Sequence, residues 1–219
     1  MNLEQIIAEL NEKSMPAKLA GMKRYGIDIQ NALGITMPEL RKLAKTIKRD
    51  HVLAQSLWDT GLHEARILAS LIDEPKLVNP EQIDAWVKDF NSWDVCDQVC
   101  GNLFCFTPFA PEKAIEFCGQ GDEFTKRAGF VLMAQLAVHH KKADDSFFMA
   151  LLPYTEREAW DERNFVKKAV NWAIRQIGKR NPVLRSAAME TAKRILHQNT
   201  KAAKWIATDA LKELISKVE

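Results

Sequence analysis

Residues 161–179, DERNFVKKAVNWAIRQIGK, decide the fold class of this chain. Apolar side chains recur in this stretch every three or four residues, at Val166, Val170, Ala173, Ile174 and Ile177. This spacing follows the 3.6-residue turn of an α-helix and predicts one helix with a single buried face. The rest of the chain repeats the pattern, and no run of four or more residues strictly alternates, so the sequence predicts helices throughout.

The predicted helices are of medium length and are joined by short loops. They cover residues 3–10, 15–25, 38–48, 51–58, 61–72, 80–90, 93–105, 122–140, 143–151, 161–179, 182–197 and 200–217, with one more starting near Pro111. Helix pairs follow one another at roughly 35–45 residues, which is typical of a HEAT-like array. We therefore expect an all-α solenoid of about 11–13 helices, with a globular helical bundle as the alternative.

Length and composition are those of one domain. The chain has 219 residues, of which 47% are hydrophobic, so residues 1–219 can form a single domain with a sizeable core. The net charge is only +2, but residues 1–12 sum to −3, residues 13–49 to +7, residues 50–125 to −10 and residues 126–219 to +8. Two basic blocks facing one side would bind phosphates, whereas scattered charges would only form a solvated surface.

The cysteines and the chain start favour a cytoplasmic protein. The N-terminal residues MNLEQIIAELNEK carry charges where a secretory signal has an apolar core, and no apolar run is long enough to span a bilayer. We expect Cys96, Cys100, Cys105 and Cys118 to be reduced, buried thiols. No CxxC pair or spaced histidine pair accompanies them, so we expect neither a metal nor another cofactor.

The run SWDVCD at residues 92–97 contains the main candidate site. Trp93 and Asp97 are four residues apart and would share one helix face, which then carries an apolar ring and a carboxylate. Ser92 is a suitable N-cap. Asp94 falls in the first helical turn, where the helix dipole explains an acid, but Asp97 lies beyond that turn. The alternative for Asp97 is an ordinary surface carboxylate.

Cations accompany a second tryptophan in the helix predicted at residues 161–179. Lys168, Trp172 and Arg175 follow a stripe that differs from the buried one. Trp172 could stack on Arg175, or it could contact a sugar or base while the cations hold phosphates. Lys126 and Arg127 lie near the start of another helix, where a cation opposes the dipole unless it meets an anion. The alternative is an exposed, solubilising pair.

The basic N-terminal block is a further candidate for binding DNA. It contains Arg41 together with seven other cations and few acids, and Tyr25 lies beside Arg24. No Walker A, GxGxxG, HExxH or GxSxG motif is present.

Five stretches together resemble the DNA alkylation repair family of HEAT-like repeat glycosylases. They are LGITMPELRKLAK at 33–45, LWDTGLHEAR at 57–66, SWDVCD at 92–97, FTKRAGFVL at 124–132 and NFVKKAVNWAIRQIGKRNP at 164–182. The resemblance implies a right-handed α–α superhelix whose concave face clamps duplex DNA. It also implies hydrolysis of the N-glycosidic bond of N3- and N7-alkylated purines without full base flipping.

The resemblance also implies roles for individual residues. Asp97 would be the catalytic carboxylate, with Trp93 and Trp172 lining the deoxyribose of the lesion. Arg127 would hold backbone phosphate, and Tyr25 would be a contact beside the lesion. From their positions and charge we further predict DNA contacts by Lys126, Lys168, Arg175 and Arg41.

The sequence departs from the family pattern at two positions, where Phe124 replaces a tryptophan and Gln135 replaces a lysine. From the resemblance as a whole we expect a glycosylase that acts on alkylated duplex DNA, and we expect a monomer because one clamp can serve one duplex. The alternative is a non-catalytic HEAT-like module that binds a DNA structure or a protein.

Overall fold

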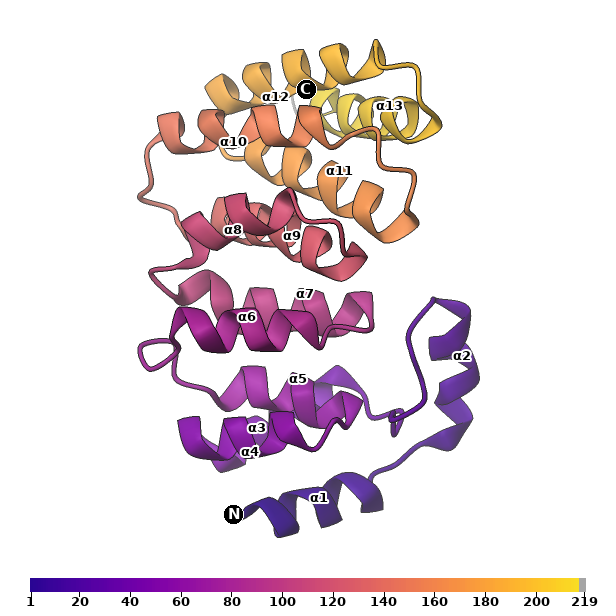
Figure 1. The fold of residues 1–219 in the computed structure, drawn as a ribbon, viewed down its shortest axis with the longest axis vertical. Helices are drawn as coiled ribbons and strands as arrows, with labels where there is room; N and C mark the ends of the chain where they lie inside the picture. The colour runs from indigo at the N-terminus through magenta and orange to yellow at the C-terminus, as the bar shows by residue number, and fades with distance from the viewer. Residues whose placement is uncertain (217–219) are drawn as a thin grey trace. The chain divides into compact units, whose positions relative to one another are not determined.

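The computed structural model describes residues 1–216, and the regular secondary structure of these residues is entirely helical (Figure 1). They form thirteen α-helices and two short 3₁₀ helices, and no strand occurs in this part of the chain. The prediction of an all-α fold with about 11–13 helices is therefore confirmed. None of the described helices is long and apolar enough to cross a bilayer.

The chain divides into two compact units. Unit 1 comprises Met1–Thr107. Its helices are α1 (Leu3–Glu12), α2 (Leu19–Arg24), α3 (Met37–Ile47), α4 (His51–Asp59), α5 (His63–Ile72), α6 (Pro80–Lys88) and α7 (Trp93–Asn102), with 3₁₀ helices at Pro16–Lys18 and Phe104–Phe106. Helix α5 is the centre of this unit, because α3, α4 and α7 all pack against it.

Unit 2 begins at Pro108. Its helices are α8 (Ala110–Cys118), α9 (Glu123–His139), α10 (Asp145–Arg157), α11 (Asn164–Gly178), α12 (Pro182–Leu196) and α13 (Lys201–Ile215). Helix α11 packs between α9 and α13, while α10 packs against α8 and α12, so alternate helices form two rows. Helices α8 and α9 approach so closely that a Cβ at Gly129 would lie 2.3 Å from the Cys118 nitrogen.

Side chains at the helix starts explain many of the boundaries. Thr36 and Glu39 form a reciprocal capping box at α3, followed by Pro38 in the first turn. Asp50, Asn79, Asp122, Asn181 and Thr200 each accept a backbone N–H as N-caps. These contacts satisfy the amides that the first helical turn leaves unpaired.

Three predicted elements differ from the observed ones. Residues 15–25 form a 3₁₀ turn and the six-residue helix α2, and the helix predicted at 93–105 changes to 3₁₀ geometry after Leu103 leaves helical backbone angles. Helix α10 continues past Pro153 to Arg157, because buried residues on both sides of the proline outweigh one missing hydrogen bond. Residue 217, predicted as the end of the last helix, lies outside the described residues.

Candidate functional site

Trp93 and Asp97 lie one turn apart on α7, and both are partly buried. The indole Nε1 of Trp93 donates a hydrogen bond to the carbonyl oxygen of Tyr25 at 3.0 Å. This bond ties α7 to the end of α2, although the two residues are 68 positions apart in the sequence. The indole is thus held in one orientation before any ligand binds.

A pocket of about 570 Å³ opens beside Trp93. Its other lining residues come from the α2 region: Ala17, Lys18, Gly21, Met22, Tyr25 and Ile27. Tyr25 is 65% exposed, and the guanidinium of Arg24 lies 5.6 Å from the centre of its ring. The structure therefore brings Trp93 and Tyr25 together at one open, mainly apolar surface, with Asp97 one turn along α7.

A buried hydrogen-bond network holds the start of α7. Ser92 occupies the N-cap position as predicted, but its hydroxyl accepts the Asp28 amide at 2.8 Å and does not cap α7. Asp94 Oδ2 accepts a hydrogen bond from His63 Nε2 at 2.9 Å, so its role is more specific than an interaction with the helix dipole. The opposite atoms, Asp94 Oδ1 and His63 Nδ1, are buried without a hydrogen-bond partner.

His63 and Glu64, in the run LHEAR at residues 62–66, were not among the predicted site residues. Burial disfavours a charged imidazole, but the hydrogen bond and charge of Asp94, with Glu64 and Asp28 nearby, outweigh burial and raise the pKa of His63. The Glu64 carboxylate accepts hydrogen bonds from three backbone amides, those of Leu33, Gly34 and Ile35, at 2.7–3.2 Å. Adjacent histidine and glutamate at a helix start were the available signal for such a network.

The stripe on α11 is less cationic than the sequence indicates. Arg175 forms ion pairs with Glu213 and with Asp209 at 3.4 Å, and Lys179 pairs with Glu213 at 2.7 Å. Lys168 is exposed. When the Gln176 amide is oriented so that its oxygen faces donors, that oxygen accepts Trp172 Nε1 at 2.9 Å.

Lys126 and Arg127 on α9 are buried, with 4% and 5% of their surfaces exposed. The alternative of an exposed, solubilising pair is therefore wrong. Arg127 Nη1 donates to the Phe165 carbonyl at 2.5 Å. Because Phe165 belongs to the first turn of α11, Arg127 joins the starts of α9 and α11, and Trp172 lies about 10 Å further along α11.

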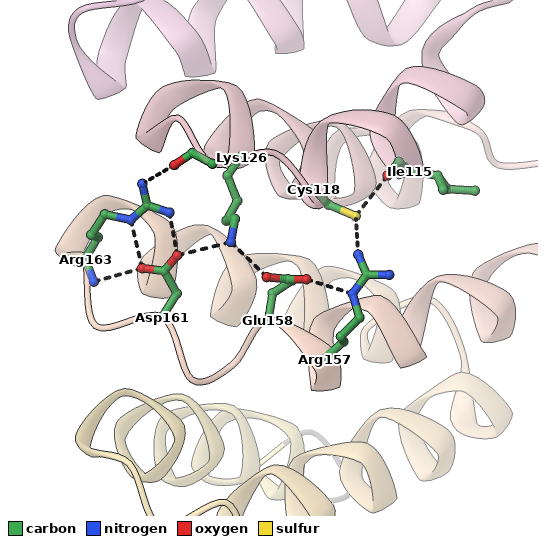
Figure 2. A network of polar contacts seen from close by, with 8 residues as sticks. Ile115, Cys118, Lys126, Arg157, Glu158, Asp161 and Arg163 are labelled. Carbon is green, nitrogen blue, oxygen red and sulfur yellow. Dashed lines mark hydrogen bonds and ion pairs between the residues drawn. The ribbon is translucent and has the colours of Figure 1, made fainter.

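Lys126 belongs to an ion-pair network inside unit 2 (Figure 2). Its ammonium lies 2.8 Å from Glu158 and 3.3 Å from Asp161. Arg163 pairs with Asp161, and Arg157 pairs with Glu158. Burial alone would raise the pKa of Asp161. The hydrogen bonds and the charge of Arg163, together with the hydrogen bond from Lys126, outweigh burial and lower that pKa.

The four cysteines are buried free thiols, as predicted. Burial raises the pKa of Cys105 to about 12 and that of Cys118 to about 11, so neither is an activated nucleophile. Within the described part of the chain, no group of three or more histidine, cysteine, aspartate or glutamate side chains could hold a metal ion.

The family model described as DNA alkylation repair enzyme matches residues 6–214 of the chain. The search of curated proteins found no match to this chain. One similar solved structure has a TM-score of 0.82 and 20% sequence identity, covering 99% of this chain and 95% of that chain. It is described as a new family of proteins related to the HEAT-like repeat DNA glycosylases with affinity for branched DNA structures. The likeness shows that the fold is HEAT-like, as predicted.

Proposed function

Since the chain belongs to the DNA alkylation repair enzyme family, we propose that it is an alkylpurine DNA glycosylase. Its substrate would be an N3- or N7-alkylated purine in duplex DNA, hydrolysed at the N-glycosidic bond without full base flipping. The observation that carries this proposal is the pair Trp93 and Asp97 on one turn of α7, with the indole fixed by Tyr25. A fixed aromatic ring at an open pocket, with a carboxylate one turn away on the same helix, suits a sugar that becomes positively charged.

The chemistry of the substrate explains why one carboxylate is sufficient. Alkylation places a positive charge on the purine, so the bond electrons neutralise the base as it leaves and little acid catalysis is needed. The developing charge then lies on the deoxyribose, and water adds to its C1′ carbon. At a separation of about 4 Å and an effective dielectric near 20, Asp97 would stabilise this charge by roughly 4 kcal/mol. If that is gained only in the transition state, the rate rises by about 10³.

Other residues would bind the DNA. Tyr25 is exposed beside Trp93, and Lys168 is exposed on α11, so both are accessible to a ligand. Trp172 and Arg127 are assigned to DNA contact by the family resemblance. Lys126 and Arg175 stay predicted DNA contacts, although each already has two carboxylate partners inside unit 2. We further propose that the protein acts in the cytoplasm as a single-domain monomer.

A second candidate function is binding of branched DNA without base release. The affinity of the structurally similar protein for branched DNA favours it. This function would use exposed cations and aromatic rings but would not require Asp97.

Release of 7-methylguanine from methylated duplex DNA tests the first proposal, and binding to a four-way junction tests the second. We expect the wild type to release the base, and we expect Asp97→Asn to lower the single-turnover rate by about 10³ while DNA affinity is retained. Asp59→Asn, an exposed carboxylate on α4, is the matched control. Junction binding with no base release would support the second function, and an unchanged rate for Asp97→Asn would remove this residue from the mechanism.

A further inference from the structure

A second cluster of cations surrounds a pocket at the C-terminal end of α3. This α3 pocket has a volume of about 350 Å³ and is lined by Arg41, Ala44, Lys45, Lys48, Arg49 and Leu71. Its four basic residues are exposed, and none of these lining residues is acidic. So much positive charge around one pocket favours a ligand with several negative charges.

Ion pairing and the helix dipole do not account for this arrangement of cations on α3. Arg41 and Lys45 are four residues apart, so their like charges face each other on the helix surface. The helix dipole favours Lys45 in the last turn, but it does not extend to Arg41 one turn earlier. Within residues 1–216, the side chains of Arg41, Lys45 and Lys48 form no ion pair. The nearby acids are occupied, because Asp50 caps α4 and Asp73 contacts His51.

The backbone of Lys48 provides an independent observation. Its φ of 69° and ψ of −166° lie in a region that is essentially restricted to glycine. Hydrogen bonds on either side hold it there: Lys48 N donates to Ala44 O at 2.9 Å, and Asp50 N donates to Ile72 O at 2.8 Å. Strained residues of this kind cluster at binding sites. A glycine would relieve the strain, but only the lysine adds a charge to the pocket.

The α3 pocket is separate from the surface around Trp93 and Asp97. Helix α5 extends between them, since His63 at its start contacts Asp94 on α7 and Leu71 in its last turn lines the pocket. Leu71 is eight positions after His63, which corresponds to about 12 Å along the axis of α5. A ligand in the α3 pocket would therefore leave the Trp93 surface open.

We propose that the α3 pocket binds the backbone phosphates of DNA at a position away from the reacting base. Lysine and arginine side chains are the usual protein partners of these phosphates. The inference rests on the proposed DNA binding but not on the proposed catalysis. Its physical basis is the combination of three cations without an ion pair in the described residues (Arg41, Lys45 and Lys48), an open pocket and a lysine in glycine-like backbone geometry.

The full-length protein allows a test in which stability and affinity change in opposite directions. Lys48→Gly should raise the melting temperature by about 2–4 °C, because strain is relieved. It should also make the negative slope of log affinity against log salt, measured with an undamaged duplex, less steep by about 0.9. The double variant Lys45→Ser with Lys48→Gly should make it less steep by about 1.8. Lys142→Ser, an exposed lysine elsewhere, and Asn199→Gly, with φ of 62°, are the controls and should leave the slope unchanged.

Each outcome has a distinct meaning. Lower slopes confined to the pocket variants, with 7-methylguanine release at saturating DNA unchanged, would support the inference. Unchanged slopes in a wild type that still binds DNA and releases the base would overturn only this inference. Affinity for inorganic pyrophosphate that depends on Lys48, without an effect on duplex binding, would also overturn it. A wild type that binds duplex but releases no base would overturn only the proposed catalysis.

Discussion

The two units use their cations in different ways. In unit 1, the cations around the α3 pocket are exposed, and Arg41, Lys45 and Lys48 form no ion pair within the described residues. In unit 2, Lys126 and Arg175 each contact two carboxylates. Both regions have a net positive sequence charge, +7 for residues 13–49 and +8 for residues 126–219. Formal charge in a sequence is therefore not the charge available to a ligand.

The comparison also separates stability from binding. An exposed cation contributes little to folding, so the fold alone gives no reason for the cations around the α3 pocket. A buried cation between carboxylates belongs to the fold itself, because the loss of any member of the network leaves the remaining buried charges less well compensated. Substitutions in the ion-pair network of unit 2 should thus change stability, and substitutions in the α3 pocket should change DNA affinity.

The largest expected effect is that of Asp161→Ala on stability. This carboxylate is 2% exposed and contacts both Lys126 and Arg163. Its removal should lower the free energy of unfolding by about 3–5 kcal/mol, whereas Arg41→Ala should change it by less than about 0.5 kcal/mol. Urea denaturation of the full-length variants measures both values. Equal losses for the two variants would contradict the division between the units.

The same carboxylate makes a prediction about pH. Because the pKa of Asp161 is lowered in the folded state, its contribution is present above the unfolded pKa near 3.9 and is lost as pH falls through the folded value. Asp161→Asn should therefore show a shallower loss of stability in acid than the wild type. Chemical denaturation between pH 2 and 6 provides the measurement, and identical acid limbs would show that the network does not contribute.

Arg127 is buried like the network cations but is predicted to contact phosphate. Arg127→Ala removes the donor to the Phe165 carbonyl, and we expect a loss of about 1–3 kcal/mol in stability. A phosphate contact would in addition lower the salt slope of DNA binding by about 0.9. Denaturation and salt-dependent fluorescence anisotropy measure the two effects separately. A changed stability with an unchanged salt slope would assign Arg127 to the fold alone.

The fold could be predicted from local patterns because helix periodicity and capping are properties of neighbouring residues. The positions of the buried face, as at Val166 and Val170 on α11, follow directly from the 3.6-residue repeat. The change to 3₁₀ geometry after α7 could not be predicted in the same way, because Phe104 and Cys105 are apolar in either conformation and are buried by tertiary packing.

The site was only partly predictable for the same reason. The pairing of Trp93 and Asp97 is a helix relation and is visible in the sequence. The bond from Trp93 to Tyr25, however, joins residues 68 positions apart. Arg175 likewise meets Glu213 from another helix, so its neutralisation depends on tertiary structure.

Lys168 and Arg175 provide a matched pair on α11, because one is exposed and the other is ion-paired. If Lys168 contacts phosphate, Lys168→Ala should lower the salt slope of duplex binding by about 0.9, and Arg175→Ala should leave it nearly unchanged. Salt titrations of an undamaged duplex measure both slopes. A larger decrease for Arg175→Ala would mean that its internal ion pairs open when DNA binds.

The smallest expected effect is that of His63→Gln, which tests how unit 1 responds to pH. The pKa of His63 is raised in the folded state, so its contribution is complete below the unfolded pKa near 6.5 and is lost as pH rises through the folded value. This is the opposite direction to that of Asp161 in unit 2. The wild type should lose stability above pH 6.5 through this group, and His63→Gln should lose less, while the exposed control His197→Gln should behave like the wild type. Urea denaturation at pH 6, 7 and 8 measures the difference. Equal pH dependence in His63→Gln and wild type would mean that the contact with Asp94 positions α7 without a proton-linked contribution to folding.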